Sequence, residues 1–174
     1  MPKFRLLLLD AGVVIAAHKL GIWSQLTDKC TISLTSTVEQ EVYYWSDEDG
    51  NGHQITLDSE IEQGKLQVID VPLEQVDKFR LVFDSTYLDR MDPGESDSLA
   101  HLFYSEEDWL ISSGDSIVYK ILGRLHRGKQ GISLEEILQQ IGLGRKLDWQ
   151  YTKEFRLKYT HQGERDSITG QDLK

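Results

Sequence analysis

The sequence predicts an α/β protein in which helices cover both faces of a central, mainly parallel β-sheet, giving a three-layer α/β/α sandwich. The apolar run Leu6–Leu9 has no period-2 alternation, which is typical of a strand buried on both faces of such a sheet. Beyond it, short β-rich segments alternate with segments of helical periodicity, which is the pattern of a parallel α/β sheet.

Length and composition favour one main domain. With 174 residues and 39% hydrophobic content, the chain can build one core, and we expect a domain over 1–146 followed by a tail over 147–174, part helical and disordered from about 162. No apolar stretch is long enough to cross a bilayer, and no signal-peptide pattern precedes the first strand. Cys30 is the only cysteine, which excludes an internal disulfide and a cysteine-based zinc cluster. We therefore expect a soluble, cytoplasmic protein.

The elements follow in order from periodicity and capping signals. Strands are predicted at 6–9, 31–34, 66–71 and 109–112, with a short last one at Ile132. Helices are predicted at 16–29, 36–45, 57–65, 73–88, after Asp92, after Asp115, at 133–142 and after 147. The last one would carry Tyr151, Phe155 and Tyr159 on an aromatic edge. The turn at 47–52 lacks the full calcium-loop pattern and is expected to be a surface loop.

The net charge of −10 is unevenly distributed. Residues 37–115 hold 20 acidic and 4 basic residues, whereas 116–158 hold 9 basic and 4 acidic ones. Because affinity for phosphate comes mainly from Lys and Arg, this composition argues against a general nucleic-acid coat protein. The candidates for contact with a nucleic-acid backbone are Lys120, Arg124, Arg127, Lys129, Arg145 and Lys146. A solvated helix face is the alternative for each of them.

Acidic residues follow the predicted strands at the sheet edge where ligands bind in open α/β proteins. Asp10 follows the first strand, Glu41 lies in the helix after the second, and Asp115 follows the fourth. Glu95 begins the helix before the fourth strand. Helical projection favours Glu41 over Glu39, and places Glu95 on the apolar face with Asp97 nearly opposite, as a reserve.

Carboxylates brought together in this way raise one another's pKa unless a cation compensates their charge. All-oxygen ligation without a nearby Cys or His pair suits Mg²⁺ or Mn²⁺. Such an ion can activate water for attack on a phosphodiester. The alternative is that Asp10 and Asp115 only cap the following helices and that Glu95 is half of a capping box with Asp92.

The sequence resembles the PIN domain family. The resemblance rests on Leu7–Asp10 with Gly12 and Ile15, on Thr35–Glu41, on Gly94–Ala100 and on Ile111–Asp115, and it covers about residues 4–143. It implies a compact α/β/α fold and a metal-dependent ribonuclease acting on single-stranded RNA, often as the toxin of a toxin–antitoxin pair.

By similarity, Asp10, Glu41, Glu95 or Asp97, and Asp115 would hold Mg²⁺ or Mn²⁺. Ser113 stands where the family often has a hydroxyl residue next to the last acid. Partners would be RNA and an antitoxin or a second copy of the chain. Gly12 departs from the pattern, because it replaces a polar Asn or Ser that can hydrogen-bond a metal-bound water.

Three other interpretations compete with this one. A haloacid-dehalogenase-like phosphatase needs a second Asp where Gly12 stands, and a Rossmann dinucleotide site needs more glycines after the first strand. A catalytically weak or inactive PIN-like module that binds RNA or protein remains as the alternative function. The histidines are scattered, and none is assigned to catalysis.

Overall fold

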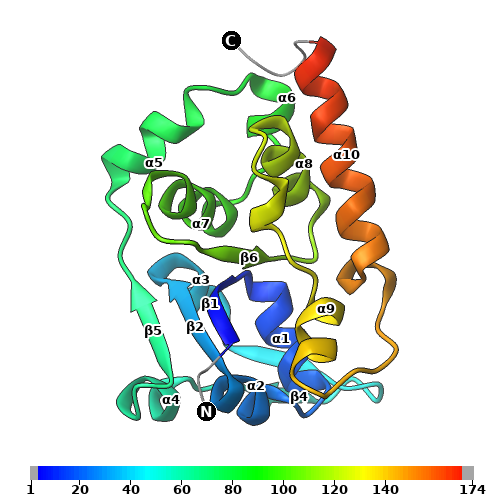
Figure 1. Ribbon diagram of the computed structural model, residues 1–174. Helices are drawn as coiled ribbons and strands as arrows, with labels where there is room; N and C mark the ends of the chain where they lie inside the picture. The colour runs from blue at the N-terminus through cyan, green and yellow to red at the C-terminus, as the bar shows by residue number, and fades with distance from the viewer. Residues whose placement is uncertain (1–3, 170–174) are drawn as a thin grey trace.

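The computed structural model describes residues 4–169 and has the predicted α/β architecture, with a parallel sheet between two layers of helices (Figure 1). Within these residues, the four strands of the main sheet run in the order β5-β2-β1-β6. Their bounds are β1 (Phe4–Leu9), β2 (Cys30–Thr35), β5 (Leu66–Ile69) and β6 (Leu110–Ser112). All three neighbouring pairs are parallel, so the carboxyl ends of the strands meet at one edge.

The helices connect these strands. They are α1 (Ala11–Lys19), α2 (Trp23–Lys29), α3 (Ser36–Glu41), α4 (Asp58–Glu62), α5 (Leu73–Arg80), α6 (Ser85–Leu88), α7 (Pro93–Tyr104), α8 (Ser116–Arg124), α9 (Leu134–Gln140) and α10 (Lys153–Thr169). Two 3₁₀ turns, η1 (Gly128–Gln130) and η2 (Trp149–Tyr151), lie in the connections. None of the helices in the described part of the chain has the length and apolar character needed to span a membrane.

Strand β1 is buried on both faces, as its apolar run predicts. Leu7 and Leu9 pack into the core beneath α1, α2 and α9. Leu8 points the other way, into the core with α5, α7 and α8. Side chains alternate between the two faces of a strand, so one strand contributes to both cores. The three layers follow from this alternation.

Two predicted helices are shorter than expected. The helix at 16–29 is divided into α1 and α2, because Gly21 adopts a positive φ of 70° between them. The segment 73–88 is divided into α5 and α6, and Asp84 caps the second of these through Thr86. In both places a new helix start replaces a continuous helix.

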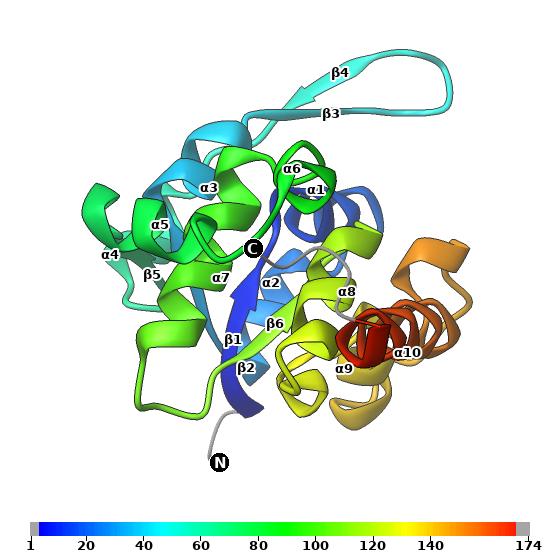
Figure 2. The same ribbon diagram turned by 90° about the horizontal axis from the view of Figure 1, so that it is seen from above.

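The prediction of a helix over 36–45 is wrong in its second half. Val42 turns extended after α3, and β3 (Tyr44–Ser46) pairs with β4 (Gly52–Gln54) in an antiparallel hairpin. Trp45 stacks on His53 with ring centroids 4.2 Å apart. The hairpin projects from the body of the molecule (Figure 2). Pairing with a segment later in the chain therefore overrides the helical spacing of this stretch.

Two predictions near the C-terminus are also corrected. No strand forms at Ile132; instead Gly131 makes a single bridge with Ile111. Residues 162–169 are helical rather than disordered, because α10 continues to Thr169, whereas 170–174 lie outside the described residues. Tyr151 belongs to η2, so it does not share a helix with Phe155 and Tyr159.

Helix α10 lies along α8 at very close range (Figures 1 and 2). A Cβ added at Gly163 would be 1.9 Å from the carbonyl oxygen of Lys120, and one added at Gly123 would be 2.0 Å from that of Thr160. The two helix backbones touch where these glycines face each other. This contact fixes the position of α10 and therefore restricts the position of η2, which lies just before it.

Candidate functional site

Asp10 and Asp115 leave neighbouring strands at the same edge of the sheet. Ser113 connects them, because its hydroxyl donates to Asp10 Oδ2 at 2.8 Å and accepts the Asp115 N–H at 2.9 Å. Asp10 is buried, with 8% of its surface exposed, while Asp115 is exposed. The backbone N–H of Asp10 also donates to the carbonyl of Ser112, which keeps the two strand ends in register.

The start of α7 brings a second buried carboxylate to this edge. Asp92 and Glu95 form a complete capping box: Asp92 Oδ1 accepts the Glu95 N–H at 2.8 Å, and Glu95 Oε2 accepts the Asp92 N–H at 3.0 Å. Glu95 is only 2% exposed, whereas Asp92 is exposed. The cap thus holds a carboxyl group below the surface.

Glu41 ends α3 beside the first turn of α7. A Cβ added at Gly94 would be 3.0 Å from Glu41 Oε2, so the absence of a side chain there leaves room for this carboxylate. Asp97, one turn further along α7, accepts a hydrogen bond from the Thr37 hydroxyl at 2.5 Å. These contacts join α3 and α7, and they place Asp97 on the side of α7 that faces α3.

The electrostatics show that these carboxyl groups lie close enough to act on one another. We call Asp10, Glu41, Asp92, Glu95 and Asp115 the acidic edge. Burial, together with the charges of Asp92 and Asp115, raises the pKa of Asp10 to about 6, against the lowering effect of the Ser113 hydrogen bond.

The same causes act on the two glutamates of the acidic edge. Burial, with the charges of Asp10, Asp115 and Asp92, raises the pKa of Glu95 well above its usual range. Burial and the charges of Asp92, Asp10 and Asp97 raise that of Glu41. Among the described residues, no Lys or Arg forms an ion pair with any member of the acidic edge.

The donor set suits a hard divalent cation, because it consists of carboxylate oxygens whose charge has no cationic partner. The carboxylate oxygens do not converge on a single point, however. In the part of the chain that the structure describes, no three acidic, His or Cys side chains already form an arrangement that could hold a metal ion. Ligation would therefore require side-chain rotation, which is open to the exposed carboxylates of Asp92 and Asp115.

The capping alternative is also observed. Asp10 accepts the Ala11 N–H at 2.9 Å, Asp115 accepts the Ile117 N–H at 3.1 Å, and Glu95 takes part in the capping box. An ionised carboxylate has about four lone-pair positions, so a cap bond leaves capacity for another ligand. A capping role at these positions is therefore compatible with binding a further ligand.

Sequence reasoning missed two members of the site. The sequence pattern identifies Asp92 only as a cap, although its charge acts on three neighbouring carboxyl groups. Tyr151 comes from η2, far along the chain, and its hydroxyl donates to the Gly12 carbonyl at 3.3 Å. A Cβ added at Gly114 would be 2.7 Å from Tyr151 Cε1, so the ring lies directly on that glycine. No local pattern signals such a long-range contact.

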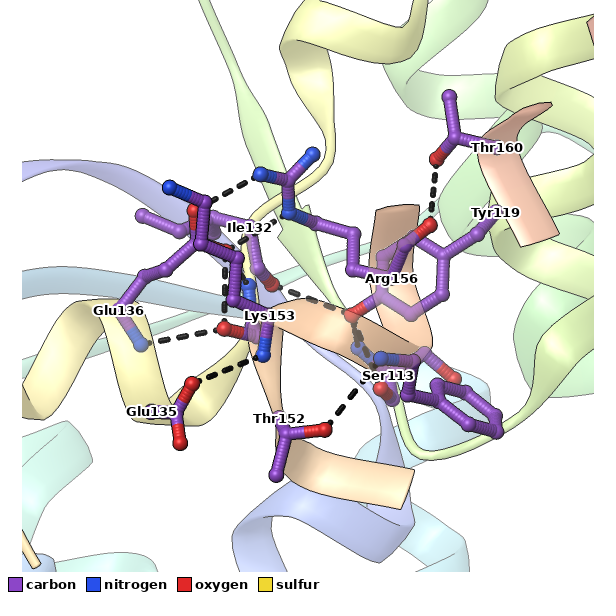
Figure 3. Close-up of polar contacts among 11 residues, drawn as sticks. Ser113, Tyr119, Ile132, Glu135, Glu136, Thr152, Lys153, Arg156 and Thr160 are labelled. Atoms are coloured by element: carbon purple, nitrogen blue, oxygen red, sulfur yellow. Dashed lines mark hydrogen bonds and ion pairs between the residues drawn. The ribbon is translucent and has the colours of Figure 1, made fainter. Parts of the chain in front are cut away.

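The segment that carries Tyr151 is fixed by contacts between α9 and α10 (Figure 3). Arg156 binds Glu136 through two hydrogen bonds of 2.7 Å, and the Lys153 N–H donates to Glu135 Oε1 at 3.0 Å. Tyr119, also drawn in Figure 3, is fully buried. Its hydroxyl accepts the Ser113 N–H at 3.1 Å and lies 3.1 Å from the Ile132 carbonyl oxygen. Ser133, which follows Ile132, donates to Glu136 Oε2 at 2.8 Å and so connects these contacts of Tyr119 with the ion pair at the base of α10.

The basic residues predicted to contact a nucleic acid differ in how far the structure exposes them. Lys120 and Arg124 are 7% and 6% exposed, and Lys120 Nζ lies over the Tyr159 ring at 5.4 Å. These two residues lie on α8, which packs against α10, so the structure buries both side chains, and their nucleic-acid role stays a prediction. Arg127 donates to the carbonyls at the end of α7, whereas Lys129 is exposed.

No protein-family model matches the sequence, and no curated protein matches it.

Proposed function

We propose that this chain is a Mg²⁺- or Mn²⁺-dependent endoribonuclease that hydrolyses phosphodiester bonds of single-stranded RNA at the acidic edge. The observation that carries the proposal is that Asp10, Glu41, Glu95 and Asp115, from four separate segments near the carboxyl edge of one parallel sheet, lie close enough for their charges to act on one another. The resemblance of the sequence to the PIN domain family supports the same activity. The same resemblance supports an antitoxin partner or a homodimer, and we propose a cytoplasmic location with it.

In this proposal, the buried and the more exposed carboxylates of the acidic edge have different roles. Asp10 and Glu95 form the buried part of the acidic edge, and Ser113 orients Asp10 through Oδ2. With Asp115, and with Asp92 or Glu41 at the margin, they would hold the cation. When bound, Mg²⁺ or Mn²⁺ compensates the carboxylate charge, lowers the pKa of a coordinated water and stabilises charge on the leaving oxygen. Glu41 is suited to accept the proton of the attacking water, because its pKa is raised and it is half-buried.

The test compares the wild type with Asp10→Asn. Asn is as good an N-cap as Asp, so this variant keeps the start of α1 while losing the charge. Asp49→Asn, in the exposed β3–β4 turn, is the matched control. Mn²⁺ binding is measured by calorimetry, and cleavage is measured on a mixed pool of single-stranded RNA with and without Mn²⁺.

We expect Asp10→Asn to weaken Mn²⁺ binding at least about tenfold, because losing a residue that merely supports a ligand already costs that much. Cleavage should fall with it, and Asp49→Asn should match the wild type. If wild type and Asp10→Asn bind Mn²⁺ alike and neither cleaves RNA, the nuclease proposal is wrong.

The alternative is a catalytically weak or inactive PIN-like module that binds RNA or protein. Two observations favour it: within the described residues no metal arrangement is already formed, and Gly12 offers no polar side chain beside Asp10. The Tyr151 hydroxyl, 3.7 Å from the position of a Cβ at Gly12, brings a polar group to that place from elsewhere in the chain. RNA binding without Mn²⁺-dependent cleavage would support the alternative.

A further inference from the structure

A cavity of about 420 Å³ lies beside the acidic edge, between α1 and the 147–151 segment. Its apolar wall comes from Ile15 and Leu20 of the α1 region and from Leu147 on the opposite side. The volume lies in the range of pockets that bind small molecules, and such pockets combine apolar walls with a few polar groups. The 147–151 segment is fixed at its far end by the α8–α10 contact, so the cavity is part of the folded structure.

The polar groups of this cavity favour an anionic ligand. Lys19 and Lys146 line it, both are exposed, and among the described residues neither forms an ion pair. Asp148 is the acid of the lining, which leaves an excess of one positive charge. A group carrying negative charge would gain by binding here.

Tyr151 connects the cavity with the acidic edge, because it belongs to both. It lines the cavity, while its hydroxyl donates to the Gly12 carbonyl and its ring lies on Gly114. The charge of Asp10 contributes to raising the Tyr151 pKa, after burial, so the phenol is near that carboxylate. A ligand in the cavity would therefore lie one side chain away from Asp10.

We propose that this cavity binds one nucleotide of the RNA strand. The base would lie against the apolar wall and the Tyr151 ring, and the phosphate would lie toward Lys19 and Lys146. A nucleoside monophosphate matches the cavity because it joins a flat apolar ring to an anionic group. Bases of single-stranded RNA are commonly held by stacking on aromatic side chains and by hydrogen bonds to their edges, which the Gln150 amide of the lining can supply. The inference rests on the proposed function for the identity of the ligand.

The experiment measures binding of AMP, GMP, CMP and UMP by calorimetry in EDTA, so that divalent ions at the acidic edge do not contribute. Inorganic phosphate and the uncharged nucleosides are titrated separately to divide the affinity between the two ends of the ligand. The variants are Lys19→Ala/Lys146→Ala, Tyr151→Ala and Tyr151→Phe. The matched control is Lys78→Ala/Lys153→Ala, which removes two exposed lysines that neither line the cavity nor belong to the candidate nucleic-acid contacts.

We expect at least one nucleoside monophosphate to bind the wild type more tightly than phosphate or its nucleoside does. The Lys19→Ala/Lys146→Ala variant should bind it about tenfold more weakly, and the control pair should match the wild type. Tyr151→Ala should also lose about tenfold, whereas Tyr151→Phe, which keeps the ring, should lose little.

Failure of this inference is distinguishable from failure of the proposed function. The cavity is not a nucleotide site if no nucleoside monophosphate binds at a concentration of about 10 mM. The same conclusion follows if both pairs of lysine substitutions have the same effect. Either result would count against the cavity inference even if Mn²⁺-dependent cleavage is observed. If nucleotides bind as expected and no variant or metal affects RNA cleavage, the cavity inference holds and the nuclease proposal is wrong.

Discussion

The Ser113 hydroxyl donates a 2.8 Å hydrogen bond to Oδ2 of Asp10, a residue 103 positions earlier in the chain. Both groups are buried, and the same hydroxyl accepts the N–H of Asp115. This contact fixes the direction of the Asp10 carboxylate and ties together the ends of β1 and β6. It also lowers the pKa of Asp10, in opposition to burial, which raises it.

Ser113→Ala should therefore destabilise the protein and raise the pKa of Asp10 further above about 6. The loss leaves a buried carboxylate short of one donor, which costs about 1–3 kcal/mol of unfolding free energy. Urea denaturation at neutral pH measures the stability, and carboxyl NMR titration measures the pKa. Ser59→Ala, at an exposed serine of α4, is the control. Equal stabilities for the two variants would contradict the prediction.

Glu95→Gln should stabilise the protein at pH 8 in the absence of divalent ions. The pKa of Glu95 is raised from its usual 4.5 in the folded state by burial and by the neighbouring carboxylates, so the folded protein binds more protons than the unfolded chain above that pH. Stability then falls as the pH rises from 4.5 through the folded pKa. Gln removes this dependence and can still complete the capping box.

The expected gain for Glu95→Gln at pH 8 is on the order of 2 kcal/mol, measured by urea denaturation over a series of pH values. Glu62→Gln, at an exposed position, should leave the pH dependence of the wild type unchanged. If the stability of Glu95→Gln declined with pH as steeply as that of the wild type, the Glu95 carboxyl would not be the cause of this pH dependence.

Glu136→Gln should show the opposite pH dependence. Burial raises the Glu136 pKa, but hydrogen bonds from Arg156 and Ser133 outweigh it and the net shift is downward from 4.5. A lowered pKa contributes stability that is present above 4.5 and is lost as the pH falls through the folded value.

At pH 7 we expect Glu136→Gln to lower the free energy of unfolding by about 1–3 kcal/mol, because Arg156 loses its charged partner while a capping residue is retained. Thermal unfolding at pH 7 and pH 3 measures the effect, and the difference from the wild type should shrink at the lower pH. A difference of the same size at both pH values would exclude the ion pair as its cause.

Gly163→Ala should destabilise the protein although alanine is the better helix former. In an open helix this change stabilises by about 1 kcal/mol, but here the added Cβ would lie 1.9 Å from the Lys120 carbonyl oxygen. Helices α8 and α10 must therefore separate. We expect the free energy of unfolding to fall by about 2–4 kcal/mol and α10 to be digested faster by proteases.

Gly144→Ala is the control for Gly163→Ala. A Cβ at Gly144 would make only ordinary contact, 3.6 Å from Gln139 Cγ. Its stability should lie within about 0.5 kcal/mol of the wild type. If Gly163→Ala were as stable as this control, the close approach of α8 and α10 would be incorrect.

Much of the fold is predictable because local patterns and tertiary packing agree. The apolar run of β1 requires two apolar faces, and the Asp92–Glu95 capping box forms where its spacing indicates. The helix expected through Trp45 is the contrasting case. Its spacing suits a helix, but pairing of β3 with β4 and the stack on His53 outweigh this weak preference.

The sequence by itself determined the layered sheet and the placement of Asp10, Glu95 and Asp115 at strand or helix ends, because burial periodicity and capping are local properties of a chain. It placed Glu41 inside a helix over 36–45, whereas in the structure α3 ends at this residue. Only the tertiary structure decided that Asp92 acts on these carboxyl groups, that α10 covers Lys120 and Arg124, and that Tyr151 lies on Gly114. These relationships depend on distances between segments far apart in the chain. Such distances are fixed by packing at places like Gly123 and Gly163, whose effect no local pattern records.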